Sequence, residues 1–197
     1  TGTSKLIVAD TGTLVLANSS ALQNSLVNLT NGDVGVLSFG LLTSATFGGL
    51  EGARGLGLTN TSGAAVALTV GNNFTGTNVC SVPLSGGGSL NKKGSGTFVL
   101  KGDNNFTGVL NVDTAQPTSG NDGAVRIASP DALAAAAQIN IRNQNSATST
   151  LQLDGLAGDI NLAQPVLLNG RNNATPAIEN LAGNNTLSGN LSLGSGG

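Results

Sequence analysis

Residues 102–108 read Gly-Asp-Asn-Asn-Phe-Thr-Gly, and a close copy, Gly-Asn-Asn-Phe-Thr-Gly, stands earlier at residues 71–76. A weaker third copy, Gly-Asn-Asn-Thr-Leu-Ser-Gly, occupies residues 183–189. A turn motif that recurs along a chain is typical of repeat architectures, in which one structural unit stacks on the next. We therefore predict structural roles for the positions that the copies share, namely Asn72, Asn73, Phe74, Gly76, Gly102, Asn104, Asn105, Phe106, Gly108, Asn184, Asn185, Leu187 and Gly189.

A longer repeat surrounds these motifs. Residues 12–17 (Gly-Thr-Leu-Val-Leu-Ala) parallel residues 123–128 (Gly-Ala-Val-Arg-Ile-Ala), and the Ala-Leu pair at 21–22 parallels the pair at 132–133. Both offsets are 111 residues. Gly-Leu-Glu-Gly at 49–52 and Gly-Leu-Ala-Gly at 155–158 form a further pair. The sequence thus predicts a module of about 110 residues, with a boundary near 105–122. We expect residues 1–197 to form one continuous segment of a longer repetitive protein.

Between the motifs, apolar and polar residues alternate in runs of three to five, such as residues 66–70, 110–112, 139–141 and 151–153. Gly, Asn, Asp or Ser separates nearly every run from the next, which is typical of short strands joined by turns. Because the units are alike and the apolar residues are mostly small aliphatics, we predict an all-β solenoid rather than a sandwich or barrel. At about 20 to 25 residues per turn it would have about eight or nine rungs. Asn side chains in the turns are expected to hydrogen-bond from one rung to the next.

One stretch departs from this alternation. Residues 129–137 read Ser-Pro-Asp-Ala-Leu-Ala-Ala-Ala-Ala. Ser129 is a suitable N-cap, Pro130 suits the first helical position, and Ala favours helix. A short helical turn is therefore predicted near 129–137, with residues 18–24 as its equivalent in the first module.

Residues 88–108, Gly-Ser-Leu-Asn-Lys-Lys-Gly-Ser-Gly-Thr-Phe-Val-Leu-Lys-Gly-Asp-Asn-Asn-Phe-Thr-Gly, resemble the autotransporter-associated β-strand repeat. Phe106 stands where that family usually has Tyr and Phe98 where it has Leu, while Gly94 and Gly96 match its glycines. The full motif covers about 20 residues, and degenerate copies extend over most of the chain. The resemblance implies a right-handed parallel β-helix passenger on the outside of a bacterial cell. It implies no enzymatic activity and carries no catalytic residues.

The composition excludes several functions. The chain has no His, so His-based metal sites and Ser-His-Asp triads are absent from the sequence. Its 8 basic and 10 acidic residues give a net charge of −2, which offers no electrostatic footprint for nucleic acid. The single cysteine, Cys80, has no intrachain disulfide partner and is expected to be either a buried small apolar residue or a free thiol. No apolar stretch approaches the length that spans a membrane. We expect no enzymatic activity, no cofactor, no metal and no transmembrane segment.

Two local groupings have alternative interpretations. Asp103 and Asp122 are about one solenoid turn apart and could form a carboxylate pair of the kind that glycosidases need, although isolated turn residues are the expectation. Lys92, Lys93 and Lys101 form the one basic cluster, which is read as solvated turn residues rather than as an anion site. Phe74 and Phe106 are expected at related points of a coil, stacked inside the solenoid.

These observations predict a non-catalytic structural or adhesive segment of a secreted or surface-displayed bacterial protein, forming a stalk, fibre or envelope coat. The expected location is extracellular, on the bacterial cell surface. Expected partners are other copies of the chain, end to end or laterally, neighbouring repeats of the same chain, and surface glycans or other cells. The alternative is a carbohydrate-binding or polysaccharide-cleaving β-helix.

Overall fold

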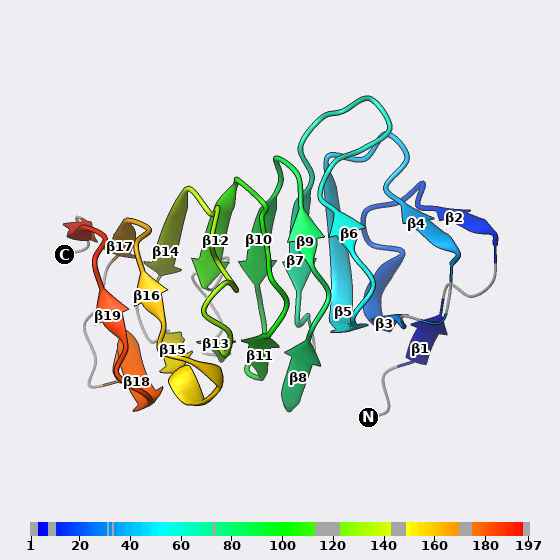
Figure 1. The fold of residues 1–197 in the computed structure, drawn as a ribbon. Helices are drawn as coiled ribbons and strands as arrows, with labels where there is room; N and C mark the ends of the chain where they lie inside the picture. Colours follow the sequence, from blue (N-terminus) through cyan, green and yellow to red (C-terminus); the bar gives the residue numbers. More distant parts are fainter. Residues whose placement is uncertain are drawn as a thin grey trace.

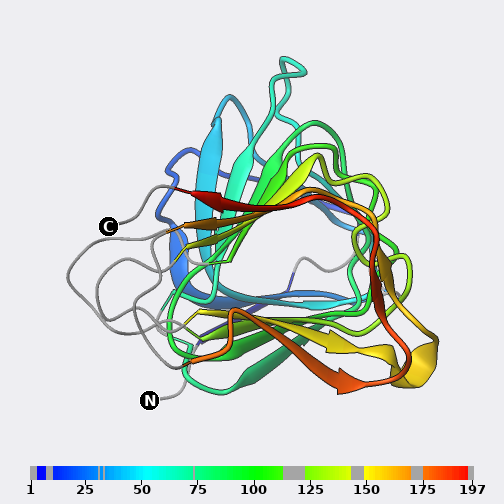
Figure 2. The same ribbon diagram turned by 90° about the vertical axis from the view of Figure 1, so that its left-hand side faces the viewer.

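The computed structural model describes residues 4–7, 11–30, 32, 34–72, 74–112, 123–142, 149–169 and 175–194. The described chain is a β-solenoid in which parallel strands stack along one axis, with the first and last strands at opposite ends (Figure 1). Viewed along the axis, the chain winds round a single closed outline (Figure 2). The predicted fold class is therefore confirmed.

The largest side of the solenoid is a nine-stranded parallel sheet. Each coil adds one strand beside the last, so strands that are neighbours in space are distant in sequence. In order along the axis the strands are β1 (Ser4–Ile7), β3 (Leu22–Leu29), β5 (Ser44–Gly52), β7 (Ala67–Val70), β10 (Ser89–Lys92), β12 (Val109–Val112), β14 (Gln138–Arg142), β17 (Val166–Asn169) and β20 (Leu191–Gly194).

A second parallel sheet has five strands and faces the first across the core. Its order is β8 (Thr77–Cys80), β11 (Thr97–Leu100), β13 (Ala124–Ile127), β15 (Thr150–Asp154) and β18 (Ile178–Ala182). A 3₁₀ helix, η1 (Gly155–Ala157), follows β15 at a corner.

The third side consists of three separate pairs of short parallel strands. These are β2 (Thr13–Val15) with β4 (Val36–Ser38), β6 (Leu56–Gly57) with β9 (Leu84–Ser85), and β16 (Asn161–Leu162) with β19 (Thr186–Leu187). Strands β4 and β6 belong to consecutive coils but do not pair with each other, so the third side is interrupted between them.

The core lies inside the coils because strand residues alternate between the interior and the outer surface. In the large sheet Leu68, Leu90, Leu110 and Ile139 stand in register on β7, β10, β12 and β14 and are fully buried. Burial of one such side chain contributes about 1.5–3 kcal/mol. Stacked rungs of similar aliphatic residues therefore account for both the alternation in the sequence and the continuous core.

The regular part of the solenoid, from β7 to β20, makes about six turns, slightly fewer than the eight or nine rungs predicted. The reason is that the N-terminal coils contribute β1, β3 and β5 to the large sheet, while the second sheet starts only at β8. Coil length also varies, from 20 residues between Leu90 and Leu110 to 29 between Leu110 and Ile139.

The predicted helical turn at 129–137 is wrong in detail. Residues 130–135 form successive turns, in which the amides of Ala132, Ala134 and Ala136 donate to carbonyls three residues earlier, and no helix is present there. Ala132, Leu133 and Ala136 are buried, so packing against the core determines this corner more than helix propensity does. Residues 18–23 form the same kind of turn series in the first module, as expected.

The proposed pairing of residues 49–52 with 155–158 does not hold structurally. The first lies in the extended strand β5, while the second forms η1 and its C-terminal boundary. A Gly-Leu-x-Gly pattern is compatible with both conformations because it contains no residue that restricts the backbone to one of them.

Candidate functional site

The motif at residues 102–108 lies on the third side of the solenoid, between β11 and β12. Within the motif Asn104 is only 1% exposed, and both ends of its side-chain amide are hydrogen-bonded inside the coil. Its Oδ1 accepts from the Leu84 amide at 2.8 Å, and its Nδ2 donates to the carbonyls of Gly102 and Ala132, both at 2.8 Å. Asn104 therefore joins three successive coils. Beside it Phe106 is buried in the core, whereas Asn105 is exposed.

The weak third copy of the motif occupies the equivalent place. Asn185 accepts from the Ile160 amide at 2.8 Å through Oδ1 and donates to the Ala182 carbonyl at 2.7 Å through Nδ2. Leu187, at the position of Phe106, pairs with Leu162 on the preceding coil. Asn184 and Gly189 bond to the preceding coil through their backbone amides.

The copy at residues 71–76 lies at a different corner, between β7 and β8, despite its closer sequence match. Asn72 donates from Nδ2 to the Gln23 carbonyl at 3.0 Å and is not buried as Asn104 is. Phe74 is half-buried and outside the core, so the expected stacking of Phe74 on Phe106 does not occur. Asn73 lies outside the described residues.

Glycines permit close contact between coils at the corners. A Cβ added to Gly76 would meet only the Phe74 ring, at 3.6 Å, but one added to Gly96 would lie 2.4 Å from the Gly76 carbonyl oxygen. At Gly108 and Gly102 the nearest backbone oxygens would be 2.2 Å and 2.6 Å away. Gly94 has a φ of +79°, a conformation that other residues rarely adopt.

The basic cluster is not a single solvated group. Lys93 and Lys101 are exposed, as predicted, but Lys92 is only 3% exposed. Its strand alternates inward at Leu90 and Lys92, and the Lys92 ammonium donates to the Gly94 carbonyl. The prediction of a solvated turn residue is therefore wrong for Lys92, whose long aliphatic stem fills the interior.

Polar side chains form two rows on the outer surfaces of the sheets. On the large sheet Asn91, Asn111 and Asn140 stand in register and bond at 2.7 Å and 2.9 Å. On the second sheet Arg126, Gln152 and Glu179 are bonded at 3.1 Å and 3.0 Å. Bonding of Asn from rung to rung thus occurs as predicted, but in these rows it lies in strands rather than turns.

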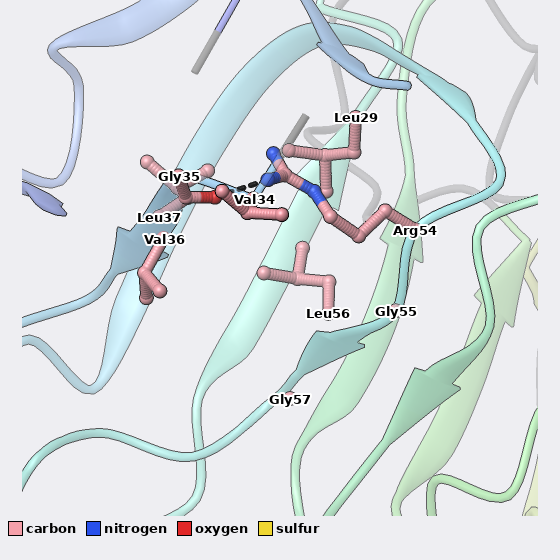
Figure 3. Close-up of a pocket in the computed structure, with 9 residues that line it drawn as sticks. All are labelled: Leu29, Val34, Gly35, Val36, Leu37, Arg54, Gly55, Leu56 and Gly57. Atoms are coloured by element: carbon pink, nitrogen blue, oxygen red, sulfur yellow. Dashed lines mark hydrogen bonds between the residues drawn. The ribbon is translucent and has the colours of Figure 1, made fainter. Parts of the chain in front are cut away.

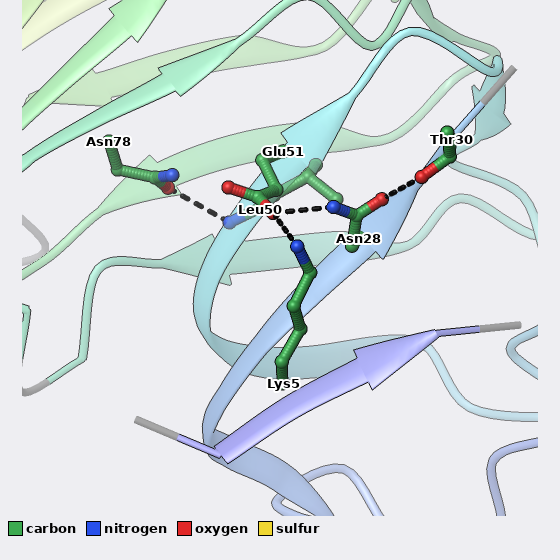
Figure 4. Close-up of polar contacts among 6 residues, drawn as sticks. All are labelled: Lys5, Asn28, Thr30, Leu50, Glu51 and Asn78. Carbon is green, nitrogen blue, oxygen red and sulfur yellow. Dashed lines mark hydrogen bonds and ion pairs between the residues drawn. The ribbon is translucent and has the colours of Figure 1, made fainter. Parts of the chain in front are cut away.

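Near the N-terminal end a small polar network surrounds Glu51 (Figure 4). The Lys5 ammonium lies 2.8 Å from Glu51 Oε1, and Asn28 Nδ2 donates to the same oxygen. Asn28 in turn accepts from the Thr30 hydroxyl. The hydrogen bond from Lys5, with a further one from Asn28, lowers the pKa of Glu51, while partial burial opposes this effect.

Beside this network the side chain of Asn78 points inward and hydrogen-bonds to the backbone of β5, a strand whose register with β3 is irregular. Asn78 stands in register with Phe98 on the second sheet, where a core residue is expected. Its Oδ1 accepts from the Leu50 amide at 2.9 Å, so the amide oxygen has a partner inside the coil (Figure 4). A Cβ on Gly49 would lie 3.0 Å from that oxygen, which explains the glycine there.

The described residues contain no group of three potential metal ligands among His, Cys, Asp and Glu. Asp103 accepts from the Ser129 hydroxyl at 3.4 Å, whereas its suggested partner Asp122 lies outside the described residues. Burial raises the pKa of the Cys80 thiol to about 12, which makes it inert at neutral pH. No helix in the described part of the chain could cross a membrane.

A hollow of about 200 Å³ opens between β4 and β6 (Figure 3). Its walls are residues 34–37 and 54–57, and Leu29, Leu37 and Leu56 form an apolar floor continuous with the core. The Arg54 side chain crosses from the β6 side and donates from Nη1 to the Gly35 carbonyl. No alternation or motif in the sequence predicts this hollow, because it arises from the separation of two adjacent coils.

No family model matches the chain, and no curated protein or solved structure matches it either. The similarity to the autotransporter-associated repeat therefore rests on the motif residues themselves.

Proposed function

We propose that the chain is a non-catalytic structural or adhesive segment of a secreted or surface-displayed bacterial repeat protein, serving as part of a stalk, fibre or envelope coat. The observation that supports this most is the continuous core along the nine-stranded sheet, secured between coils by buried and surface amides such as Asn104 and Asn111. Such a structure extends as a rod along one axis, because each coil contacts mainly the coils next to it. The resemblance of residues 88–108 to the autotransporter-associated β-strand repeat also supports this proposal.

Location is tested with antibodies raised against the folded chain. Intact cells of the source organism are expected to be labelled as strongly as permeabilised cells. Labelling that appears only after permeabilisation contradicts surface display.

The last described coil supports self-association. Leu187, Leu191 and Leu193 continue rows of core residues, yet no further described coil covers them, and Leu193 is 81% exposed. The outer edge of β20 also presents unpaired backbone groups, which can pair with another strand. We propose that a second copy or a neighbouring repeat covers this end.

Sedimentation velocity over a range of concentrations tests the association. Leu193→Lys is expected to abolish it, because a charge would be buried between coils. Leu156→Lys is the matched control, since Leu156 is 84% exposed but lies on η1, in the coil before the end coil rather than on it. A monomer at all concentrations, or equal effects of both variants, contradicts coverage of this end by a second copy.

The second candidate function is carbohydrate binding. The row of Asn91, Asn111 and Asn140 supports it, because side-chain amides on a flat outer sheet can bond to sugar hydroxyls. A glycan array combined with a reducing-end assay distinguishes binding from cleavage. Binding that is lost in Asn111→Val would favour this alternative over a purely structural role.

A further inference from the structure

The polar network around Glu51 joins side chains from three neighbouring strands (Figure 4). Lys5 lies on β1, Asn28 on β3 and Glu51 on β5, which are adjacent in the large sheet. Asn28 stands in register with Glu51, and Lys5 stands in register with Leu26, two residues before Asn28. Folding therefore brings together an amine, a carboxamide and a carboxylate that are far apart in the sequence.

One oxygen atom of Glu51 contacts both nitrogen atoms of this group. The Lys5 Nζ lies 2.8 Å from Glu51 Oε1, and Asn28 Nδ2 donates a hydrogen bond to the same oxygen. The Lys5 ammonium and the Asn28 amide thus approach a single atom from neighbouring strands (Figure 4). Asn28 is only 9% exposed, and its Oδ1 accepts from the Thr30 hydroxyl.

These four groups supply what the attack of an amine on an amide requires. The Lys5 nitrogen, once it has lost a proton, is a nucleophile. Glu51 Oε1 can take that proton and deliver it to Asn28 Nδ2 as this nitrogen leaves, because it contacts both atoms. The Thr30 hydroxyl donates to the Asn28 oxygen, on which negative charge develops during the attack. The lowered pKa of Glu51 keeps its carboxylate ionised at neutral pH and ready to accept the proton.

We propose that the folded chain links Lys5 to Asn28 through a covalent amide bond. Lys5 Nζ bonds to Asn28 Cγ, the bond from Cγ to Nδ2 breaks, and Nδ2 leaves as an ammonium ion with the two protons that Lys5 loses. An alkylammonium group and a carboxamide thus give a secondary amide and an ammonium ion, so atoms and charge balance without an oxidant or cofactor. The ion pair of Lys5 with Glu51 is the state before this bond forms. The proposal goes beyond the structural role above and does not depend on where the protein is displayed.

The bond would fasten the first described strand to the next coil. Strand β1 has four residues and, among the described strands, pairs only with β3. A short edge strand of this kind opens more easily than the central strands of a sheet. A covalent link from Lys5 to Asn28 prevents β1 from leaving the sheet even when its backbone hydrogen bonds break.

Mass spectrometry of the whole chain tests the proposal. During incubation of the folded protein at pH 8, the mass is expected to fall by that of one ammonia molecule. Trypsin cleaves after Lys5 and Arg54 in the unlinked chain, whereas residues 1–54 should remain one peptide in the linked chain, because the Lys5 side chain is then an uncharged amide. Cleavage after Arg54 is the internal control for digestion. Protein kept in guanidinium chloride should show no loss, because folding brings the reacting groups together.

Four variants separate the contributions. Lys5→Arg keeps the positive charge but has no amine to attack, so it should retain its full mass. Lys101→Arg is the matched control, since Lys101 is exposed and lies outside the network, and it should react like the wild type. Glu51→Gln should slow the reaction at least about a hundredfold, and Thr30→Val about tenfold.

Two results would overturn the proposal. One is a mass that stays unchanged in the folded wild type. The other is a loss of ammonia that persists in Lys5→Arg or occurs equally in guanidinium chloride, because an Asn that closes a ring with its own backbone also loses ammonia but needs neither the lysine nor the fold.

Discussion

At the scale of single residues, the interior of this solenoid depends on a few polar side chains that hydrogen-bond to backbone groups of other coils. Asn104 shows why an amide can be better than an aliphatic residue in a core position, since it bonds to backbone groups of three coils at once. Asn78 makes a single such bond to the irregular strand β5, because its Oδ1 accepts from the Leu50 amide. Buried amides of this kind stabilise only when all their partners are present.

Asn104→Leu is therefore expected to lower the free energy of unfolding by about 3 kcal/mol, because buried backbone groups of Leu84, Gly102 and Ala132 lose their partner. Urea denaturation measures the change. Asn105→Leu is the control from the same motif, and because Asn105 is exposed its effect should stay within about 0.5 kcal/mol. Equal losses in the two variants would show that Asn104 does not join the coils.

The lowered pKa of Glu51 predicts how the free energy of unfolding depends on pH. Its pKa is lowered in the folded chain, so its contribution is present above the pKa of the unfolded state and is lost as the pH falls through the lower folded value. The ion pair with Lys5 is partly solvated, so the contribution is less than about 1 kcal/mol.

Unfolding free energies measured from pH 6 down to pH 3 should fall more steeply in the wild type than in Glu51→Gln. The difference between the two proteins should shrink as acid protonates Glu51. A constant difference over this range would contradict the assigned pKa shift.

At the scale of elements, corners rather than strands limit which residues can be accepted. Strand residues alternate between the interior and the outer surface, whereas corner glycines lie against the backbone of the preceding coil. Gly108, Gly102 and Gly96 all have a backbone oxygen where a Cβ would stand.

Gly108→Ala is expected to cost at least about 2 kcal/mol, because the new Cβ would lie 2.2 Å from the Gly88 carbonyl oxygen and the two coils must separate. Thermal or urea unfolding checks this value. Gly12→Ala provides the comparison, since nothing lies within 4 Å of a Cβ there, and it should be neutral or slightly stabilising. Tolerance of alanine at Gly108 would mean that the coils are not in contact at this corner.

The element scale also shows how much the sequence could predict. Alternation of apolar and polar residues predicted the strands because their period of two is imposed by the backbone itself. The motif did not predict which corner of the coil it would form, because residues 71–76 and residues 102–108 lie at different corners. What differs is the strand that precedes each copy, β7 of the large sheet in one case and β11 of the second sheet in the other.

Burial of Lys92 and the hollow beside Arg54 could not be predicted in the same way. Lys92 follows Asn91 in a polar run, and only its register with Val70 and Val112 places it inside. The hollow depends on the separation of β4 from β6, which involves the path of two whole coils. Both features are set by relations between residues about 20 positions apart, and a local pattern does not contain them.

At the scale of the whole molecule, stability is shared between neighbouring coils and varies along the axis. Cys80 provides a probe for this variation, because it lies buried on β8, the edge strand of the second sheet. Its thiol reacts only when that edge opens, since burial raises its pKa to about 12.

Native protein at pH 8 is expected to resist alkylation by iodoacetamide, whereas protein in guanidinium chloride should react completely. Labelling at low denaturant should begin before the global transition if β8 opens locally, and at the transition if the coils unfold together. Rapid reaction of the native chain without denaturant would contradict the burial of Cys80.

The two rows of outer polar side chains have a polarity along the axis. In the asparagine row each amide donates toward the N-terminal end, from Asn140 to Asn111 and from Asn111 to Asn91. In the other row donation runs the opposite way, from Arg126 to Gln152 and on to Glu179. A middle position of either row both gives and receives a hydrogen bond, and the side-chain amides of Asn111 and Gln152 do this without charge. The rod therefore has chemically different ends, and a coil inserted within a row keeps the row intact only if its residue at that place can both donate and accept a hydrogen bond.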